Sequence, residues 1–399
     1  MQRTLPPDNP APPSPPARAT VRYVAEDAPS GYGDAADRLV RASRDAGTRI
    51  EYRGWSDTAH GDPPAFLPFS RDECPDERVG PGAPTVAHLI PEHYPLVRQV
   101  ASEVAANDAT GPIVGHTVWE TDRLPQHWPA LLNTADLVIV PSEWNREVFA
   151  ASGVHVPLAV VPHVAITPVP GDRGAGLGLR DDHVIFYTIG RWDERKAVFR
   201  TVQAFLDAFT GDDPVTLVVK TGHVIEMPPS GWGAQSPLAC QTAWQVAELV
   251  HHHRNPPHVQ LEVDTWPQDR VDGLHHRGDC YVTVARGEGW GMGAFDAAAH
   301  GNPVIATRWG GFCEYLRADD AYLVDHELVA VQSCAPRSFS PDQHWAEANL
   351  DHAVELLRAV AADPEAARDR ARPAQARVLR DYSGPVVVAQ FGKVLAQLG

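Results

Sequence analysis

Lysine is nearly absent from this chain of 399 residues. Of 34 basic residues only three are lysine, namely Lys196, Lys220 and Lys393, and arginine supplies the rest. A general preference for arginine explains the pattern as a whole, and the three lysines are either chance survivors or chemically required. Two of them, Lys196 and Lys220, fall in segments that the motifs below single out as candidate binding sites.

Paired cysteines are absent as well. The five cysteines are scattered, odd in number and without a CxxC spacing. This pattern argues against a disulfide scaffold and a zinc site, and it suits a reducing compartment. No apolar run is long enough to span a bilayer, and the Pro-rich residues 1–20 lack the apolar core of a signal peptide. We therefore expect a cytoplasmic protein with a disordered N-terminal tail and no integral membrane segment.

An excess of positive charge is also missing. The formal net charge is −17, which disfavours nucleic acid and anionic membrane surfaces as general partners. Hydrophobic residues make up 43% of the chain, as is usual for soluble globular proteins, and the length allows two domains.

Strand-like and helix-like segments alternate along most of the chain. Such alternation predicts parallel sheets with helices on both faces. A Gly- and Pro-rich stretch without periodicity interrupts it and then the pattern restarts, which predicts two α/β domains. The predicted divisions are a tail at 1–20, a first domain at 21–166, a linker at 167–182, a second domain at 183–380, and a C-terminal helix at 381–399 that packs back toward the first domain.

The most informative segment is 286–311, RGEGWGMGAFDAAAHGNPVIATRWGG. A glycine turn between a strand and a helix presents free backbone amides and the positive end of a helix dipole, which suits phosphate. Glu288 and Asp296, eight positions apart, would repel phosphate but accept hydrogen bonds from hydroxyl groups. Phosphate and a polyol together indicate a sugar nucleotide.

A second candidate segment is GRWDERK at 190–196. It follows an apolar strand and begins a helix, so that Arg191 and Lys196 are expected near the glycine turn. Two cations at that place could neutralise a diphosphate. The alternative is a surface ion pair with Asp193 or Glu194.

These motifs occur together in one well-known arrangement. GRWDERK, Lys220 at a strand end and GEGWGMGAFDAAAHGNPVIAT resemble a family 4 retaining glycosyltransferase of the GT-B fold. In the first half, SGYG and PSEWNREVFAASGV resemble further parts of that family. The likeness runs from about Val21 to the end and is strongest over 184–316. It implies an α/β protein with two Rossmann-like, doubly wound parallel-sheet domains that face each other across a cleft.

The resemblance also implies roles for individual residues. Arg191 and Lys196 would hold the donor diphosphate, Glu288 the hydroxyls of the donor sugar, and His116 would lie near the reacting centre. Asp296 stands where the family has a ribose-binding glutamate and is one methylene shorter. His116 can also be read as a merely structural histidine, and Glu120 as either an acceptor ligand or a helix cap. The remaining candidates for donor binding are Gly31, Gly33, Lys220, Gly289, Trp290, Gly291 and Met292.

The implied activity is retaining transfer of a hexosyl group from a UDP-, GDP- or dTDP-linked donor. The expected acceptor is a hydroxyl of a saccharide or small metabolite, with no metal or other cofactor. The histidine run 251–253 and the pair His275–His276 are expected on the surface rather than around a metal ion. Two alternatives stay open: a sugar-nucleotide epimerase of the same fold, and an inactive sugar-nucleotide-binding relative that regulates a partner.

Overall fold

The computed structural model describes most of the chain beyond the N-terminal tail. The described residues are 20–26, 30–56, 65–66, 79–80, 82–105, 111–168, 176–224, 241–332 and 338–398. The tail predicted at 1–20 therefore lies outside the described residues, apart from Thr20.

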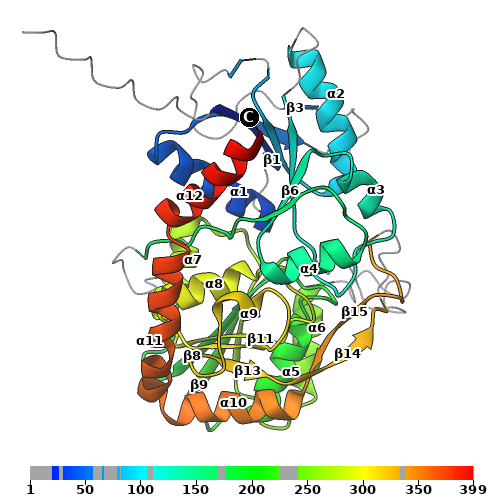
Figure 1. Ribbon diagram of the computed structural model, residues 1–399. Coiled ribbons are helices and arrows are strands. Elements are labelled where there is room, and N and C mark those ends of the chain that lie inside the picture. Colours follow the sequence, from blue (N-terminus) through cyan, green and yellow to red (C-terminus); the bar gives the residue numbers. More distant parts are fainter. Residues whose placement is uncertain are drawn as a thin grey trace, which may run out of the picture.

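The first domain is built on a seven-stranded sheet in the order β3-β2-β1-β4-β5-β6-β7 (Figure 1). All neighbouring strands are parallel except β2 and β3. The strands are β1 (Thr20–Glu26), β2 (Arg49–Ser56), β3 (Ala65–Phe66), β4 (Thr85–His88), β5 (Ile113–His116), β6 (Leu137–Val140) and β7 (Leu158–Val160). Its helical segments are α1 (Gly31–Asp45), η1 (Pro91–His93), α2 (Tyr94–Ala105), α3 (Trp128–Leu132) and α4 (Glu143–Ala151).

Local sequence explains these elements. The central strands read as nearly unbroken apolar runs, and β4, β5 and β6 are buried at every position, as expected for strands covered on both faces. Ser30 caps the N-terminus of α1, and its side-chain oxygen accepts a hydrogen bond from the amide of Gly33 at 3.0 Å. Its apolar stripe, including Leu39 and Val40, packs into the core.

The second domain repeats the plan with a six-stranded parallel sheet in the order β10-β9-β8-β11-β12-β13. The strands are β8 (Val184–Ile189), β9 (Val215–Lys220), β10 (His258–Glu262), β11 (Cys280–Thr283), β12 (Val304–Thr307) and β13 (Tyr322–Val324). The helices are α5 (Val198–Ala208), α6 (Thr242–His251), α7 (Gln268–Arg277), α8 (Met292–Ala299), α9 (Phe312–Tyr315), α10 (Leu350–Ala362) and α11 (Pro364–Asp381). The predicted α/β class with two doubly wound parallel sheets is confirmed.

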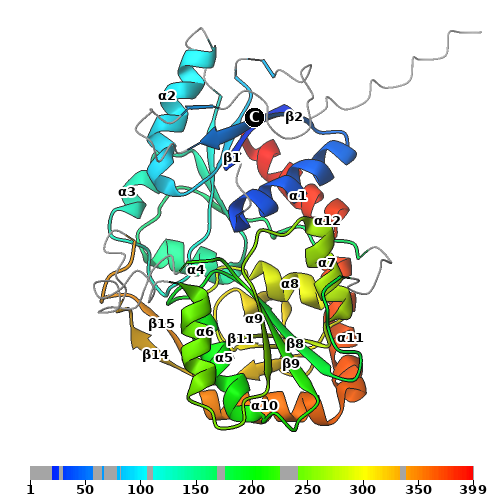
Figure 2. The same ribbon diagram turned by 180° about the vertical axis from the view of Figure 1, so that it is seen from behind.

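The chain passes twice between the two domains. The first passage lies between the end of β7 and the start of β8, where residues 169–175 of the predicted linker are outside the described residues. The second is made by α11, α12 (Gly384–Leu395) and the short η2 (Ala396–Leu398). Helix α12 packs against α1, and Phe391 meets the ring of Tyr23 in β1, so the last helix rests on the first domain (Figures 1 and 2).

A two-stranded antiparallel sheet was not anticipated from the sequence. It consists of β14 (His326–Ala330) and β15 (His344–Ala348). The backbone amide of His344 donates to Asp122 of the first domain at 2.5 Å, and Phe339 stacks 5.1 Å from Trp119. The hairpin therefore adds a further contact between the two domains.

Candidate active site

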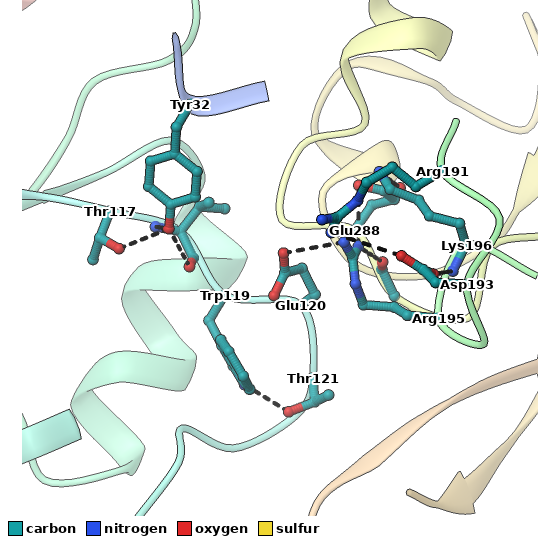
Figure 3. A network of polar contacts seen from close by, with 12 residues as sticks. Tyr32, Thr117, Trp119, Glu120, Thr121, Arg191, Asp193, Arg195, Lys196 and Glu288 are labelled. Carbon is teal, nitrogen blue, oxygen red and sulfur yellow. Dashed lines mark hydrogen bonds and ion pairs between the residues drawn. The ribbon is translucent and has the colours of Figure 1, made fainter. Parts of the chain in front are cut away.

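Three charged residues meet where β8 and β11 end. Lys196 follows β8 and donates a hydrogen bond from its ammonium group to a carboxylate oxygen of Glu288, which follows β11. The guanidinium of Arg195 lies 3.6 Å from the other oxygen of Glu288 (Figure 3). Neighbouring parallel strands end at one edge of the sheet, which explains why segments 92 residues apart come together.

A buried hydrogen bond and an unusual backbone conformation constrain the loop that carries Lys196. Asp193 is buried, and its carboxylate accepts a hydrogen bond from the Lys196 backbone amide at 2.6 Å. The next residue, Ala197, is fully buried and has a φ of 48°, the left-handed region that an alanine rarely adopts. Such strain persists only where surrounding packing holds it, and it occurs often beside functional groups.

Arg195 is a central residue that the sequence reading missed. Its side chain is buried, donates to the carbonyl of Gly287 at 2.7 Å, and lies 3.5 Å from Glu120 of the first domain. One cation thus stands between Glu288 of the second domain and Glu120 of the first (Figure 3). In the sequence, only its position beside Lys196 points to a role for Arg195. The direction of a loop side chain cannot be predicted from the sequence, so its contacts with Glu288 and Glu120 could not be foreseen.

Glu120 is held in an unusual environment for a carboxylate. Burial raises the pKa of its carboxyl group; the nearby Arg195 opposes this change and the like charge of Glu288 adds to it. The helix-cap interpretation is wrong, because the next helix, α3, begins at Trp128 and has His127 as its N-cap. The acceptor contact stays a prediction. The observed contact is with Arg195.

The glycine turn 286–291 is pressed against the first domain. A Cβ on Gly289 would overlap a methyl group of Val118 and come within 2.8 Å of the carbonyl of Trp119. Gly291 has a φ of 84° and immediately precedes α8, so a side chain there would be strained. Both glycines are therefore explained by close backbone approach and turn geometry.

Trp290 and Met292, which flank Gly291, differ in their burial. The ring of Trp290 is buried among Phe295, Tyr315 and Tyr382, so it belongs to the core. Met292 begins α8 and is partly buried. The predicted use of backbone amides from Gly289 to Met292 stays a prediction.

Asp296 is engaged in an ion pair across the domain interface. Its two carboxylate oxygens accept hydrogen bonds from Nη1 and Nη2 of Arg38 at 2.6 and 2.7 Å. Arg38 lies on α1 of the first domain and was not anticipated, since nothing distinguishes it from other helix-surface arginines in the sequence. The predicted ribose contact of Asp296 would have to share this carboxylate with Arg38.

Three buried histidines lie on the first-domain side of the interface. His116 is stacked on His88 with ring centroids 3.8 Å apart, and His163 is 6.4 Å from each. Burial lowers the pKa of all three imidazoles, that of His163 to about 3. His88 was missed, although it ends a strand in the same way as His116, which was the signal used for the latter.

The other predicted donor ligands lie at the start of α1, after β8 and at the end of β9. Gly31 and Gly33 form the first turn of α1, where a Cβ on Gly31 would meet no atom within 4 Å, so packing does not require this glycine. Arg191 is half exposed and 3.7 Å from Asp193. Lys220 ends β9 and sits over the ring of Trp266 at 5.6 Å, and burial lowers the pKa of its amine.

Histidine, cysteine and acidic side chains are the usual metal ligands of proteins. Within the described part of the chain, no three histidine, cysteine or acidic side chains are grouped so that they could hold a metal ion. The expected surface position of His275 is wrong: the residue is buried, because Tyr187 and its neighbours on sheet and helix enclose it, and its Nδ1 pairs with the Tyr187 hydroxyl at 2.8 Å. No helix in the described ranges is long and apolar enough to cross a membrane.

Comparison with known proteins identifies the family. The model of the family described as "Family 4 Glycosyltransferase in conflict systems" matches residues 130–390, which is more than half of the chain. The chain belongs to this family. The glycosyltransferase resemblance seen in the sequence is thereby confirmed.

Curated relatives of this family 4 glycosyltransferase share less than 30% identity with it over the matched residues. A D-inositol 3-phosphate glycosyltransferase of Geodermatophilus obscurus is 28% identical over 229 residues, which cover 51% of this chain and 47% of the relative. One of the same name from Rhodococcus jostii is 27% identical over 58% of this chain and 45% of the relative. The matches thus span about half the length of these relatives.

Solved structures share the two-domain architecture at low identity. Sucrose-phosphate synthase of Thermosynechococcus elongatus superposes with a TM-score of 0.67 at 17% identity, covering 96% of this chain and 99% of that chain. The HepE protein of Anabaena, solved with UDP and glucose, gives a TM-score of 0.63 at 14% identity, with 95% and 100% covered. These likenesses support the GT-B fold.

Proposed function

We propose that this family 4 glycosyltransferase transfers a hexosyl group from a nucleoside-diphosphate donor to a hydroxyl acceptor, with retention at the anomeric carbon and without a metal ion. The observation that carries the proposal is the contact between Lys196 and Glu288 at the ends of β8 and β11. It places a cation suited to diphosphate beside a carboxylate suited to sugar hydroxyls. The HepE neighbour, whose structure contains UDP and glucose, supports a donor of this class.

The charges around this contact suit the departure of a diphosphate. Arg191, Arg195 and Lys196 all lie on the loop after β8, and the N-terminus of α8 follows the glycine turn. Fixed positive charges and a helix N-terminus stabilise the negative charge that grows on a leaving diphosphate. They supply what a divalent ion supplies in other transferases, which is our reason for proposing metal independence.

We propose that retention arises from a reaction on one face of the sugar. We assign no covalent nucleophile, because the carboxylate of Glu288 is paired with Lys196 and flanked by Arg195. The departing phosphate would instead take the proton of the acceptor hydroxyl on the same face of the sugar. Closure of the two domains would exclude water and limit hydrolysis of the donor.

The acceptor is proposed to bind the first domain, with Glu120 among its ligands. The curated relatives are named for D-inositol 3-phosphate, so phosphorylated polyols are the first acceptors to test, followed by simple saccharides and small hydroxyl metabolites. We place the reaction in the cytoplasm because the cysteines show no pairing pattern.

The test is a donor panel followed by an assay of transfer. Thermal shift with UDP-, GDP- and dTDP-sugars should reveal one stabilising class, and NMR of the product formed with that donor should show an anomeric configuration equal to that of the donor. EDTA should leave the rate unchanged. Lys196→Ala should abolish the donor-induced shift, whereas Lys393→Ala, on the exposed side of α12, is the matched control.

The same experiment separates the alternatives. Isomerised donor in the absence of any acceptor would favour an epimerase. The Arg38–Asp296 pair, at the position expected to bind ribose, gives a specific reason to test for an inactive binder as well. Tight nucleotide binding with no turnover of any donor would favour the inactive binder. The absence of a thermal shift with any donor would overturn the donor site.

A further inference from the structure

The strand register brings two histidines and one tyrosine together in the first domain. His88 and His116 are paired residues on β4 and β5, so their rings stack at 3.8 Å with an interplanar angle of 8°. Tyr23 lies on β1, two residues before Ala25, the register partner of His88. Residues two apart on a strand share a face, and the long tyrosine side chain reaches both rings.

The Tyr23 hydroxyl contacts the same nitrogen of each histidine. It lies 2.8 Å from Nδ1 of His88 and 3.3 Å from Nδ1 of His116. A tyrosine hydroxyl has one proton, so it can donate to only one of these nitrogens. To bond both, it must accept from the other, and that nitrogen must carry a proton. The two neutral imidazoles therefore hold opposite tautomers.

The two distances indicate which histidine accepts. Hydroxyl donors make bonds near 2.7–2.8 Å, whereas ring N–H donors make longer ones. The two distances therefore favour donation from the Tyr23 hydroxyl to Nδ1 of His88 and from Nδ1–H of His116 to the tyrosine oxygen. Nε2 of His116 is then left with a free lone pair.

That nitrogen has no partner within the described residues. Nε2 of His116 is buried and forms no hydrogen bond to any of them, although a buried polar atom normally has one. The ring lies 6.4 Å from His163, which in turn meets Trp290 of the glycine turn at 5.4 Å. His163 therefore neighbours both His116 and the turn to which the sugar is assigned.

We propose that Tyr23 and His88 are positioning residues that fix His116 as the Nδ1–H tautomer, so that its unprotonated Nε2 accepts a hydrogen bond from a hydroxyl of a sugar substrate. The second clause of this proposal rests on the proposed glycosyl transfer. The tautomers themselves do not depend on it.

Burial supports the neutral states on which this arrangement depends. Burial lowers the pKa of His88 and of His116 well below the usual value, with mutual repulsion among the buried imidazoles adding to the effect. Burial also raises the pKa of Tyr23 well above its usual value, so its hydroxyl keeps its proton. A protonated Nε2 could not accept, and a tyrosinate could not donate.

The tautomers can be read directly by nitrogen-15 NMR of the histidine-labelled full chain, with the His116 signals assigned through their loss in His116→Gln. We expect a protonated Nδ1 and an unprotonated Nε2 at His116, and the reverse at His88. The same tautomer at both rings, or an unprotonated Nδ1 at His116, would overturn the proposal.

Substitutions at position 88 provide a matched pair. Asn can still accept from Tyr23, so His88→Asn should keep the His116 tautomer. Leu cannot accept, which frees the Tyr23 proton for Nδ1 of His116, so His88→Leu should convert His116 to the Nε2–H form. Tyr23→Phe should leave His116 in a mixture of both tautomers. An unchanged tautomer in His88→Leu would overturn the coupling.

Kinetics then tests the hydrogen bond to substrate. Loss of one such bond should lower kcat/KM about tenfold in His88→Leu. The fall should be smaller in Tyr23→Phe, where part of the protein keeps the accepting Nε2, and His88→Asn should stay within about threefold of the wild type. Equal activities across the three variants would remove the substrate contact from the proposal. Absence of transfer by the wild type would instead overturn the proposed function, while the NMR result still decides the tautomers.

Discussion

Arg38 and Asp296 join the two domains through a bidentate ion pair. The guanidinium comes from α1 and the carboxylate from α8, and two nearly parallel hydrogen bonds of 2.6 and 2.7 Å connect them. The side chains are only 15% and 8% exposed. Paired geometry of this kind combines charge with directionality, so the contact ties the first helix of one domain to the glycine-turn helix of the other.

Breaking this pair should destabilise the folded protein. Arg38→Ala or Asp296→Ala leaves a nearly buried partner charge, and each should lower the free energy of unfolding by about 2–4 kcal/mol. The double variant should cost less than the sum of the two. On the same helix, the more exposed pair Asp37–Arg41 is a matched control expected to contribute under about 0.5 kcal/mol. Urea unfolding measures all of these, and additive single effects would contradict the coupling.

The same pair should compete with the nucleotide. If Asp296 binds ribose as the family resemblance implies, the ribose hydroxyls compete with Arg38 for its carboxylate oxygens. Arg38→Gln should therefore strengthen UDP binding and Asp296→Asn weaken it, each by about tenfold, the value of one charge-assisted hydrogen bond. Calorimetric titration measures the affinities, with Arg41→Gln as the control. Equal affinities in all variants would remove Asp296 from the ribose site.

Glu288 should be the most sensitive carboxylate for catalysis. Glu288→Gln keeps the shape of the side chain but removes the charge that pairs with Lys196 and Arg195. We expect kcat/KM to fall by about a hundredfold or more, as on loss of a charged group at a reacting centre. Glu355→Gln on the exposed face of α10 is the control in the same transfer assay. Activity of Glu288→Gln near that of the wild type would remove the sugar-binding role.

Gly289 should control the contact between the glycine turn and the first domain. In Gly289→Ala the new methyl group would collide with Val118, so the two segments must separate. Overpacking of this kind should cost about 1–3 kcal/mol of unfolding free energy and reduce transfer. In Gly392→Ala the added Cβ meets no atom within 4 Å, and this helical position should gain up to about 1 kcal/mol. Thermal unfolding of both variants checks the contrast.

His163 should make the protein sensitive to acid. Burial, with repulsion from Arg38, lowers its pKa from 6.5 to about 3, so the unfolded state binds a proton more readily than the folded state. Its contribution to stability is complete above pH 6.5 and is lost as the pH falls toward 3.

Between pH 6 and 4, His163→Asn should therefore remove about 1.4 kcal/mol per pH unit from the slope of unfolding free energy. Urea unfolding at several pH values measures the slopes. His155→Asn, which removes an exposed histidine of the same domain, serves as the comparison. Parallel curves for the wild type and His163→Asn would contradict the prediction.

Much of the fold could be predicted because local sequence patterns indicate its strands, helices and turns. Apolar runs such as LVIV at 137–140 indicate buried parallel strands, and the glycine turn before α8 shows where a strand gives way to a helix. The hairpin of β14 and β15 escaped prediction. Its strand β14 is largely exposed, both strands carry charged residues and lack a strong alternation, and contacts with Asp122 and Trp119 of the other domain hold it.

The candidate site was predictable only in part. The motifs identified Lys196 and Glu288, and the structure brings these two together. Arg195, Arg38 and His88 were missed, since each acquires its importance from a partner at least 28 residues away in the chain. Which oxygen or nitrogen such a side chain meets depends on how the strands align and how the domains close.

The sequence by itself determined the class of fold, the family and the segments around which a donor site is proposed, because strand periodicity, glycine turns and charge at strand ends are local properties. Tertiary structure alone decided how the charges are shared. It placed Arg195 between two carboxylates and paired Asp296 with Arg38. It also brought the Tyr23 hydroxyl within hydrogen-bond distance of two stacked histidines. These pairings arise between strands and domains, where distance and burial rather than residue type determine which groups interact.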